Sequence, residues 1–552
     1  QKTFKKMYDD HLVFRGKRII NWCSKHQTTL SDVETTDEEK KDAFYYIQYG
    51  PFVIGTARPE TKFGDKYVVV HPKDSRYAQY KDGDTFEVEW INSKITATLI
   101  KDEAIDMDFG TGAMTITPWH DAIDFEIAEK YKLDKEQIIN FRGKLLPIAG
   151  EFAGLKIAEA RPKIIEKLKS KGLLVRVEEN YIHNVPCCYK CKTPIEPQIM
   201  DQWFVKMKSL AESALKVVDD GKIKFIPDNY EKIFRYWMNN SIDWNISRQI
   251  VWGIPIPAKI CTSCDFAFPD LKDKESQCPK CKGLLKKDTD TFDTWFSSGQ
   301  WPLLSLGYSQ GKDWKIFHPT DVMETGHDLI FKWVPRMIIF SLYLQKQIPF
   351  HTVYLHGLVN DAKGHKMSKS KGNVINPINI IDKYGTDALR MALIVGNSPG
   401  TDMSLSEDKI RGYKNFANKL WNIHRFINSN TEKITADSKK ISSYSDKILL
   451  KELSEITKDI TSDFEEYRFY LAAEKLYQYI WHRFADVIIE ESKPILAGPD
   501  IKAILSRQQT LIVIFSQVIT MFHPFMPFIT EEIYQTLPIK DKNYLIITPW
   551  PK

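Results

Sequence analysis

The sequence lacks the long apolar run that a membrane span requires, because no stretch of its 552 residues approaches roughly 18 consecutive apolar residues. Its first residues, Gln1 to Phe4, do not form the apolar core of a signal peptide. The chain contains no internal repeat and no low-complexity tract. These absences argue against a membrane, secreted or repeat protein, and we expect a cytoplasmic globular one.

The chain also has little net charge. Its 77 basic and 72 acidic residues leave a charge of only +5, so bulk positive charge does not make it a nucleic-acid binder. Any RNA contact must therefore come from a local arrangement of side chains. Apolar residues make up 43% of the chain, enough for several cores, and the length suggests about three to four domains.

The chain has only eight cysteines, and their spacing indicates metal sites. Thiols stay reduced in the cytoplasm, which favours metal binding over disulfides. Cys261-x-x-Cys264 and Cys278-x-x-Cys281 lie in turn-rich sequence, and the gap between them fits a small zinc ribbon. The alternative is a set of free buried thiols.

A second zinc site is predicted from two separate half-sites. Cys188-x-x-Cys191 needs two more ligands, and Cys23-Ser-Lys-His26 offers a thiolate and an imidazole three residues apart on a tight turn. Because the whole segment 27–187 separates the two halves, the metal would join the ends of whatever is inserted there. Cys187 is left over, and we predict a structural role for it.

The segment from Gly364 to Asn373 is suited to holding a polyphosphate. Its lysines supply mobile positive charges, its serines supply short donors, and Gly372 lets the backbone approach an anion closely. On charge alone, an ordinary solvated loop is the alternative. The order Lys-Met-Ser-Lys-Ser resembles the signature loop of class I aminoacyl-tRNA synthetases. That resemblance implies an ATP-binding loop made of Lys366, Met367, Ser368, Lys369 and Ser370, in which Lys366 and Lys369 act in catalysis.

The pattern of apolar, charged and turn-forming residues changes several times along the chain. After a strand at 17–22, the mixed charges at 35–42 predict a loop that marks a boundary. Short strands separated by Gly and Pro turns then predict a β-rich insertion from Ala43 to about Val185, with strands at 45–49, 52–54 and 67–71.

Residues 300–400 alternate strand and helix, with strands at 320–324 and 352–356 and a helix between them. This pattern is typical of a nucleotide-binding α/β fold whose sites lie at the carboxyl ends of strands. After Ser404 the sequence becomes helical. We expect one helix at about 467–489 that ends before Pro494, and others at 508–522 and 530–537.

The first helix of this carboxyl-terminal part has two faces. An apolar stripe is formed by Phe416, Leu420, Ile423 and Ile427. The opposite face carries amides and guanidinium groups, and it either contacts RNA or is simply solvated; its residues are Arg411, Asn415, Asn418, Asn422 and Arg425.

Further segments resemble the valyl-tRNA synthetase family, and the similarity covers nearly the whole chain. The run that begins Gly326-His327-Asp328 resembles an adenosine-binding turn, which implies that Gly326 allows close approach and that Asp328 binds ribose hydroxyls. His356-Gly357 resembles the strand end against which adenine packs. Isoleucyl and leucyl enzymes share this architecture, and Pro118-Trp-His-Asp121 is more similar to the valyl group.

Two segments resemble that family's editing domain, namely Gly55-Thr-Ala-Arg-Pro-Glu-Thr61 and the run from Gly110 to Asp121. The family needs such a domain because a hydrophobic valine pocket cannot strongly reject threonine. The resemblance implies that Asp121 binds the α-ammonium group of threonine esterified to tRNA and that Arg58 contacts the terminal nucleotide. The residues that would read the hydroxyl or orient water are Thr61, Thr117 and Asp124.

Some residues of these segments have simpler interpretations. Asp121 is also suited to cap a helix that starts just after it. His120 is predicted to be structural, because a lone imidazole beside a cap is more often a packing residue. The family often has lysine where this chain has Thr115, so one cationic contact of the editing pocket is not accounted for.

The predicted fold class is α/β: the second half of a Rossmann-like class I synthetase catalytic domain with an inserted β-rich editing domain, zinc-binding connecting elements and a helical anticodon-binding bundle. The predicted domains are the end of the amino-terminal catalytic half (1–35), the editing domain (36–185), the connecting region (186–300), the second catalytic half (301–403) and the anticodon-binding bundle (404–552).

The paired-histidine signature His-x-Gly-His of class I enzymes does not occur in the sequence. In the family it precedes the segment similar to 17–22, so we expect an amino-terminal truncation, and the carboxyl end also stops where relatives often continue.

The predicted function is ATP-dependent activation of valine and its transfer to tRNA(Val), with editing of mischarged Thr-tRNA(Val). Expected cofactors are ATP, Mg²⁺ and Zn²⁺, and the expected state is a monomer. The alternatives are an isoleucyl enzyme, a piece that acts only as a deacylase and tRNA-binding module, and a zinc-dependent structural RNA binder.

Overall fold

The computed structural model describes residues 1–31, 34–308, 311–367, 372–431, 441–538 and 542–551. The chain divides into two compact units. The first consists of Gln1–Val217, Arg235–Ile316 and Phe331–Pro349, and the second of Val218–Phe234, Phe317–Ile330 and Phe350–Lys552. Each unit is therefore built from segments that are distant in sequence. None of the described helices is long and apolar enough to cross a membrane.

The first unit begins with helix α1 (Lys2–Asp9) and strand β1 (Val13–Cys23), and β1 contains the strand predicted at 17–22. β1 pairs antiparallel with β10 (Gln198–Val205) and with β2 (Thr28–Leu30), and β12 (Trp244–Asn245) extends the sheet beyond β10. The return strand β10 thus lies beside β1, although the inserted segment separates them in sequence.

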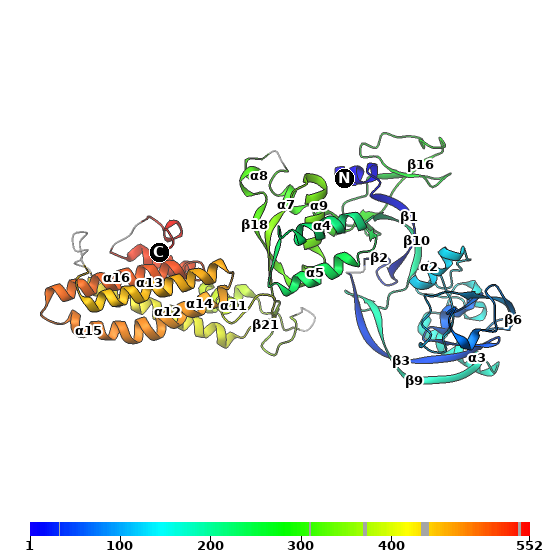
Figure 1. The fold of residues 1–552 in the computed structure, drawn as a ribbon, viewed down its shortest axis with the longest axis horizontal. Coiled ribbons are helices and arrows are strands. Elements are labelled where there is room, and N and C mark those ends of the chain that lie inside the picture. Colours follow the sequence, from blue (N-terminus) through cyan, green and yellow to red (C-terminus); the bar gives the residue numbers. More distant parts are fainter. Residues whose placement is uncertain (32–33, 309–310, 368–371, 432–440, 539–541, 552) are drawn as a thin grey trace. The chain divides into compact units, whose positions relative to one another are not determined.

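A long two-stranded ribbon leads into the insertion (Figure 1). β3 (Thr35–Tyr49) pairs antiparallel with β9 (Leu174–Cys188), starting from the pair Thr35 and Cys188. The loop predicted at 35–42 is therefore wrong. None of those eight residues is buried, so the strand has no apolar face to give an alternating pattern. Backbone pairing and cross-strand side-chain contacts, such as the hydrogen bond between His183 Nε2 and Asp42 Oδ2 at 3.0 Å, stabilise it instead.

The inserted β-rich part has its own core. β4 (Phe52–Thr56) pairs with β3, and a four-stranded sheet has the order β6 (Thr85–Glu89), β7 (Lys94–Lys101), β5 (Tyr67–Val70) and β8 (Ala113–Thr115). The predicted strands at 52–54 and 67–71 are confirmed within two residues, and the strand predicted at 45–49 is the end of the much longer β3. Helices α2 (Ala122–Tyr131) and α3 (Ile157–Ser170) and the 3-10 helix η2 (Pro59–Gly64) complete this part.

The connecting region is made of short elements. A three-stranded sheet has the order β15 (Ala267–Pro269), β14 (Ala258–Cys261) and β16 (Leu285–Lys287), and β13 (Ser247–Arg248) pairs with β17 (Thr291–Phe292). The helices between 208 and 345 are α4 (Lys208–Asp219), α5 (Asn229–Asn239), α6 (Thr294–Ser298), α7 (Trp301–Leu304), α8 (Lys312–Phe317) and α9 (Trp333–Gln345).

The second unit contains a parallel sheet of order β11 (Lys224–Ile226), β19 (Phe350–His356) and β18 (Thr320–Gly326). The two predicted strands of the nucleotide-binding fold are β18 and β19. Because they are parallel and in register, Gly326 lies opposite His356 at their carboxyl ends. Helices α10 (Pro377–Tyr384) and α11 (Thr386–Ile394) follow, and β20 (Val359–Asn360) pairs with β21 (Met403–Ser404).

The rest of the second unit is a helical bundle, as predicted. It consists of α12 (Glu407–Thr431), α13 (Tyr444–Glu465), α14 (Phe469–Gln478), the π-helical η8 (Tyr479–Ile489), α15 (Glu490–Leu496), α16 (Ile501–Phe522) and α17 (Pro527–Thr536). The predicted stop before Pro494 is wrong, because Pro494 lies inside α15 and the helix ends at Leu496. The apolar stripe of α12 is buried, and its predicted polar face is exposed.

Candidate functional site

A cavity of about 1390 Å³ lies in the inserted β-rich part of the first unit. It is lined by η2, by the segment from β8 to the start of α2, and by residues of α3 and the ribbon. The two motifs predicted for the editing pocket are far apart in sequence, yet both face this cavity. All five of their predicted residues line it, namely Arg58, Thr61, Thr117, Asp121 and Asp124.

Asp121 has the capping role and also lines the cavity. It is the residue before α2, and its Oδ1 accepts from the backbone N–H groups of Ile123 (2.9 Å) and Asp124 (3.1 Å). Within the described residues its Oδ2 accepts no hydrogen bond. Asp121 is exposed, so the second oxygen is open to a cationic ligand. Capping and ligand binding are therefore compatible in one carboxylate.

Asp124, in the first turn of the same helix, is buried, with 3% of its surface exposed. Its Oδ2 accepts from the backbone N–H of Thr117 at 2.6 Å, and its Oδ1 has no hydrogen-bond partner within the described residues. Burial, together with the negative charge of Asp121, raises the pKa of Asp124 to about 7. The carboxyl group therefore exchanges its proton near neutral pH.

Lys62, in the cavity wall, and its neighbour Asp65 are charged residues that were not predicted from the sequence. The Lys62 Nζ donates to Thr115 O (3.1 Å) and Thr117 Oγ1 (3.3 Å) and lies 3.3 Å from Asp65 Oδ2. Lys62 thus brings an ammonium group to the segment where Thr115 replaces a common lysine. The sequence signal was the unaccounted cation, together with a lysine directly after Thr61.

Arg58 is held between two carboxylates. Its guanidinium group contacts Glu60 at 3.2 Å and Glu196 at 2.7 Å, and Arg161 reaches the same Glu60 at 2.9 Å. Burial alone would raise the pKa of Glu196, but its contacts with Arg58 and His120 lower the pKa by more, so the net shift is downward. The side chain of Arg58 is one-third exposed, so part of it still faces solvent.

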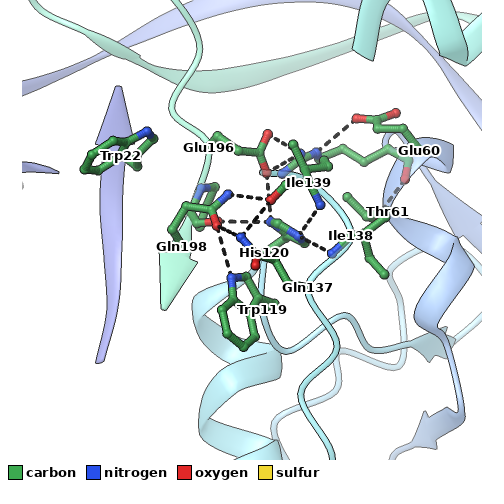
Figure 2. Close-up of polar contacts among 12 residues, drawn as sticks. Trp22, Glu60, Thr61, Trp119, His120, Gln137, Ile138, Ile139, Glu196 and Gln198 are labelled. Carbon is green, nitrogen blue, oxygen red and sulfur yellow. Dashed lines mark hydrogen bonds and ion pairs between the residues drawn. The ribbon is translucent and has the colours of Figure 1, made fainter. Parts of the chain in front are cut away.

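His120 makes structural contacts on both ring nitrogens (Figure 2). Its Nε2 accepts from the backbone N–H groups of Ile138 and Ile139, each at 3.0 Å, and its Nδ1 lies 3.0 Å from Glu196 Oε1. With both nitrogens occupied, His120 joins the inserted part to the strand that returns to the sheet. Gln198 on that strand accepts from Trp119 Nε1 at 3.0 Å.

The structure gathers both predicted sets of metal ligands. The ligand atoms within each set of four lie within 4.8 Å of one another: Cys23, His26, Cys188 and Cys191 form one set, and Cys261, Cys264, Cys278 and Cys281 form the other. In the first set the sulfur atoms of Cys23 and Cys191 are 3.6 Å apart. In the second set the distance is 3.4 Å between Cys261 and Cys281 and 3.8 Å between Cys264 and Cys278. Two sulfurs about 2.3 Å from a tetrahedral zinc would be roughly 3.8 Å apart, so both sets fit that ion.

The first metal set lies at the base of the ribbon. Cys188 is the last residue of β9 and pairs with Thr35, while Cys23 ends β1. A bound ion would therefore tie together the two chain segments that enter and leave the insertion. Cys187 is fully buried and is not part of either set.

The predicted adenosine residues meet at the carboxyl ends of β18 and β19. A Cβ on Gly326 would lie 2.8 Å from Asp328 Oδ1 and 3.5 Å from His356 Nε2, so three predicted residues are neighbours. A Cβ on Gly357 would lie 1.8 Å from the Thr401 carbonyl oxygen, which only glycine permits. Both glycines thus allow neighbouring protein groups to approach the strand ends, which is where ligands bind in nucleotide-binding α/β folds.

Hydrogen bonds to Asp361 hold the described ends of the segment from Gly364 to Asn373, the predicted ATP loop. Asp361 accepts from the backbone N–H groups of Lys363 and His365, each at 2.9 Å, and from Asn373 Nδ2 at 2.8 Å, so it joins both ends of the loop. Lys366 is exposed and Met367 is half-buried. The other predicted loop residues, Ser368, Lys369 and Ser370, lie outside the described residues.

Comparison with known proteins supports these features. The family described as tRNA synthetases class I (I, L, M and V) matches residues 1–406, and the anticodon-binding domain of tRNA ligase matches residues 446–552. Valine–tRNA ligase of Clostridium tetani is 42% identical over 562 aligned residues, and that of Carboxydothermus hydrogenoformans is 41% identical. Both alignments cover 100% of this chain and 63% of the relative, so the chain spans about 63% of the length of these relatives.

Solved structures show the fold. The Agrobacterium radiobacter LeuRS, in a ternary complex with tRNA and LeuAMS, has a TM-score of 0.54 and 17% identity, covering 100% of this chain and 74% of that one. The Mycobacterium tuberculosis methionyl-tRNA synthetase with methionyl-adenylate has a TM-score of 0.51 and 17% identity over 63% of this chain and 65% of that one. Because the family match covers residues 1–406, the predicted fold class is confirmed, and the chain belongs to the class I tRNA synthetases of the I, L, M and V group.

Proposed function

We propose that this chain carries the editing, connecting and anticodon-binding parts of a valine–tRNA ligase. The full reaction activates valine with ATP and transfers it to tRNA(Val), and editing removes threonine from mischarged tRNA(Val). The observation that carries the editing function is the convergence of Arg58, Thr61, Thr117, Asp121 and Asp124 on one cavity. Similarity to valine–tRNA ligases along the whole chain supports valine over isoleucine.

In the proposed hydrolysis, a water oxygen adds to the ester carbonyl carbon of threonyl-tRNA. The bond between that carbon and the ribose oxygen then breaks, and the ribose oxygen takes a proton. The products are free threonine and tRNA with a free terminal hydroxyl group. Asp121 binds the α-ammonium group of the substrate through its open oxygen. Asp124 orients the water and accepts its proton, and a pKa of about 7 suits this step at neutral pH.

The hydrogen bonds of Thr117 suggest how threonine is recognised. Its hydroxyl group donates to Asp65 Oδ1 at 3.0 Å and accepts from Lys62, so its proton is already committed. It has one acceptor site left and can bind the hydroxyl proton of threonine. Valine has no such proton. Thr61 also lines the cavity, and we propose that Arg58 contacts the terminal nucleotide through its exposed part.

For activation, we propose that Gly326, Asp328, His356 and Gly357 bind adenosine. Lys366 and Lys369 would stabilise charge on the phosphates, with Met367, Ser368 and Ser370 completing the ATP loop. Mg²⁺ would accompany ATP. The eight metal ligands would hold two structural zinc ions. The exposed polar face of α12 is a candidate tRNA contact, although ordinary solvation explains it equally well.

The domain boundaries at 35, 185, 300 and 403 remain predictions, as does the monomeric state. The proposal includes a cytoplasmic location, where ATP and tRNA are available. A second candidate function, deacylase and tRNA-binding module alone, shares the same cavity and the same helical bundle.

Two assays test the proposal. Hydrolysis of Thr-tRNA(Val) by this chain, abolished by Asp121→Ala, supports the editing pocket, and full hydrolysis in that variant would refute the assignment. Exchange of pyrophosphate into ATP with valine then distinguishes the two candidate functions. We expect no exchange by residues 1–552 alone, and exchange when the polypeptide also carries the paired-histidine segment of its relatives.

A further inference from the structure

Lys62 is a buried lysine beside the proposed hydrolytic cavity, and no role has yet been assigned to it. Only 7% of its surface is exposed, although lysines are rarely buried unless they are paired. It lies in η2 directly after Thr61 and lines the cavity. Its position in the cavity wall therefore calls for an explanation other than surface charge.

The contacts of Lys62 all lead to the residues of the proposed reaction. Its ammonium group donates to Thr117 Oγ1 at 3.3 Å and lies 3.3 Å from Asp65 Oδ2, while Asp65 Oδ1 accepts from the same Thr117 hydroxyl at 3.0 Å. Lys62 and Asp65 thus hold this hydroxyl from both sides. The backbone N–H of Thr117 in turn donates to Asp124 at 2.6 Å. One lysine therefore connects to both proposed substrate-reading groups.

The charges around Asp124 also link Lys62 to the proposed reaction. The groups that act on it are Asp121 on its own helix and Lys62 and Asp65 from η2 and the residue that follows it. The two acidic neighbours raise the pKa of Asp124, and Lys62 lowers it. Lys62 is thus the cation that favours the ionised form of Asp124.

We propose that Lys62 is a positioning residue of the hydrolytic pocket: together with Asp65 it fixes the hydroxyl of Thr117, the residue whose backbone N–H donates to Asp124. This inference rests on the proposed editing function. It assigns to η2 the cationic contact that the sequence left unaccounted for at Thr115 on β8.

The geometry of Thr115 supplies a sharp test. Lys62 Nζ is 3.1 Å from the Thr115 carbonyl oxygen, and the side chains of Lys62 and Thr115 both lower the pKa of Asp65 after burial has raised it. Positions 62 and 115 therefore lie beside the carboxylate of Asp65, although the Thr115 hydroxyl itself makes no hydrogen bond within the described residues. Exchanging the two residues, Lys62→Thr with Thr115→Lys, would deliver the ammonium group from the opposite element without changing composition.

The experiment compares Lys62→Thr, the exchanged double variant and the control Lys66→Thr in hydrolysis of Thr-tRNA(Val). Lys66 is nearby but its side chain is 45% exposed. For Lys62→Thr we expect kcat to fall by about tenfold or more with little change in KM, and the rising part of the pH profile to move up by about one unit, because loss of the cation raises the pKa of Asp124. The exchanged variant should recover both properties, and the control should match the wild-type chain.

An unchanged kcat and pH profile in Lys62→Thr would overturn the inference. An exchanged variant that folds normally and is as slow as Lys62→Thr would overturn it too. If Lys62→Thr does not fold, Lys62→Thr with Asp65→Asn leaves no unpaired charge, and wild-type hydrolysis by that variant would refute the positioning role. Failure of the editing proposal itself is distinguishable, because the unmodified chain would then not hydrolyse Thr-tRNA(Val).

Discussion

Asp121 allows the cap of α2 and the binding of a substrate cation to be measured separately. Asn at this position keeps an oxygen that can accept from the N–H groups of Ile123 and Asp124, whereas Ala keeps none. Loss of an N-cap costs about 1 kcal/mol of stability. Loss of a hydrogen bond to a charged group costs about 1.5 to 3 kcal/mol, which is a factor of about 10 to 150 in affinity or rate.

Asp121→Asn should therefore lower kcat/KM for Thr-tRNA(Val) hydrolysis by about 10- to 150-fold, with stability close to that of the wild-type chain. Asp121→Ala should show the same kinetic loss and be less stable by about 1 kcal/mol. Because the charge of Asp121 raises the pKa of Asp124, the pH profile of the Asn variant should also move to lower pH.

The measurements are deacylation rates across pH 5 to 9 and unfolding in urea. Asp134→Asn is the matched control, since the side chain of Asp134 is 74% exposed. An Asn variant that hydrolyses the substrate within twofold of wild type would refute the ammonium-binding role. An Asn variant as unstable as the Ala variant would instead refute the cap geometry.

Three other outcomes are expected. The pKa of Asp124 in the folded chain, about 7, lies above its unfolded value, so the wild-type chain loses stability as the pH rises toward 7. Above that pH, Asp124→Asn should be more stable than the wild-type chain by up to about 4 kcal/mol. Thermal unfolding should show that this difference vanishes near pH 4. Metal analysis should find two zinc ions per chain, and one in Cys191→Ser, with intact zinc content refuting the site. Arg507 Nε lies 2.6 Å from Asp446 Oδ1, and both side chains are buried. Arg507→Met should therefore lower the free energy of unfolding in urea by about 3 to 5 kcal/mol, because it leaves the Asp446 carboxylate buried without its cation. Adding Asp446→Asn should recover much of the loss.

Much of the site was predictable because its residues occur in short motifs. Each half of a metal site is a turn that holds two ligands at fixed spacing, so the eight ligands could be named without the fold. The editing motifs could be recognised for the same reason, and so could the glycines at the strand ends. The apolar stripe of α12 followed from helical periodicity alone.

Other features left no periodic or local signal. The ribbon of β3 and β9 has no buried face at 35–42, so its sequence resembles a charged loop until the partner strand is present. Pro494 was expected to end a helix, but it lies inside α15, two residues before the helix ends at Leu496. The error at 35–42 arose because pairing with a distant segment overrides local preferences.

The sequence by itself provided grounds for the family resemblance and for two predicted sets of metal ligands, because residue type and short spacing carry that signal, and the resemblance in turn named the five residues of the proposed editing pocket. Only the tertiary structure decided that these residues line one cavity and that the ammonium group of Lys62 lies beside Thr117. The hydrogen bonds and charges of Lys62 depend on its distance from Asp65, Thr115 and Thr117, and folding alone sets the distances from η2 to β8 and the segment that follows it.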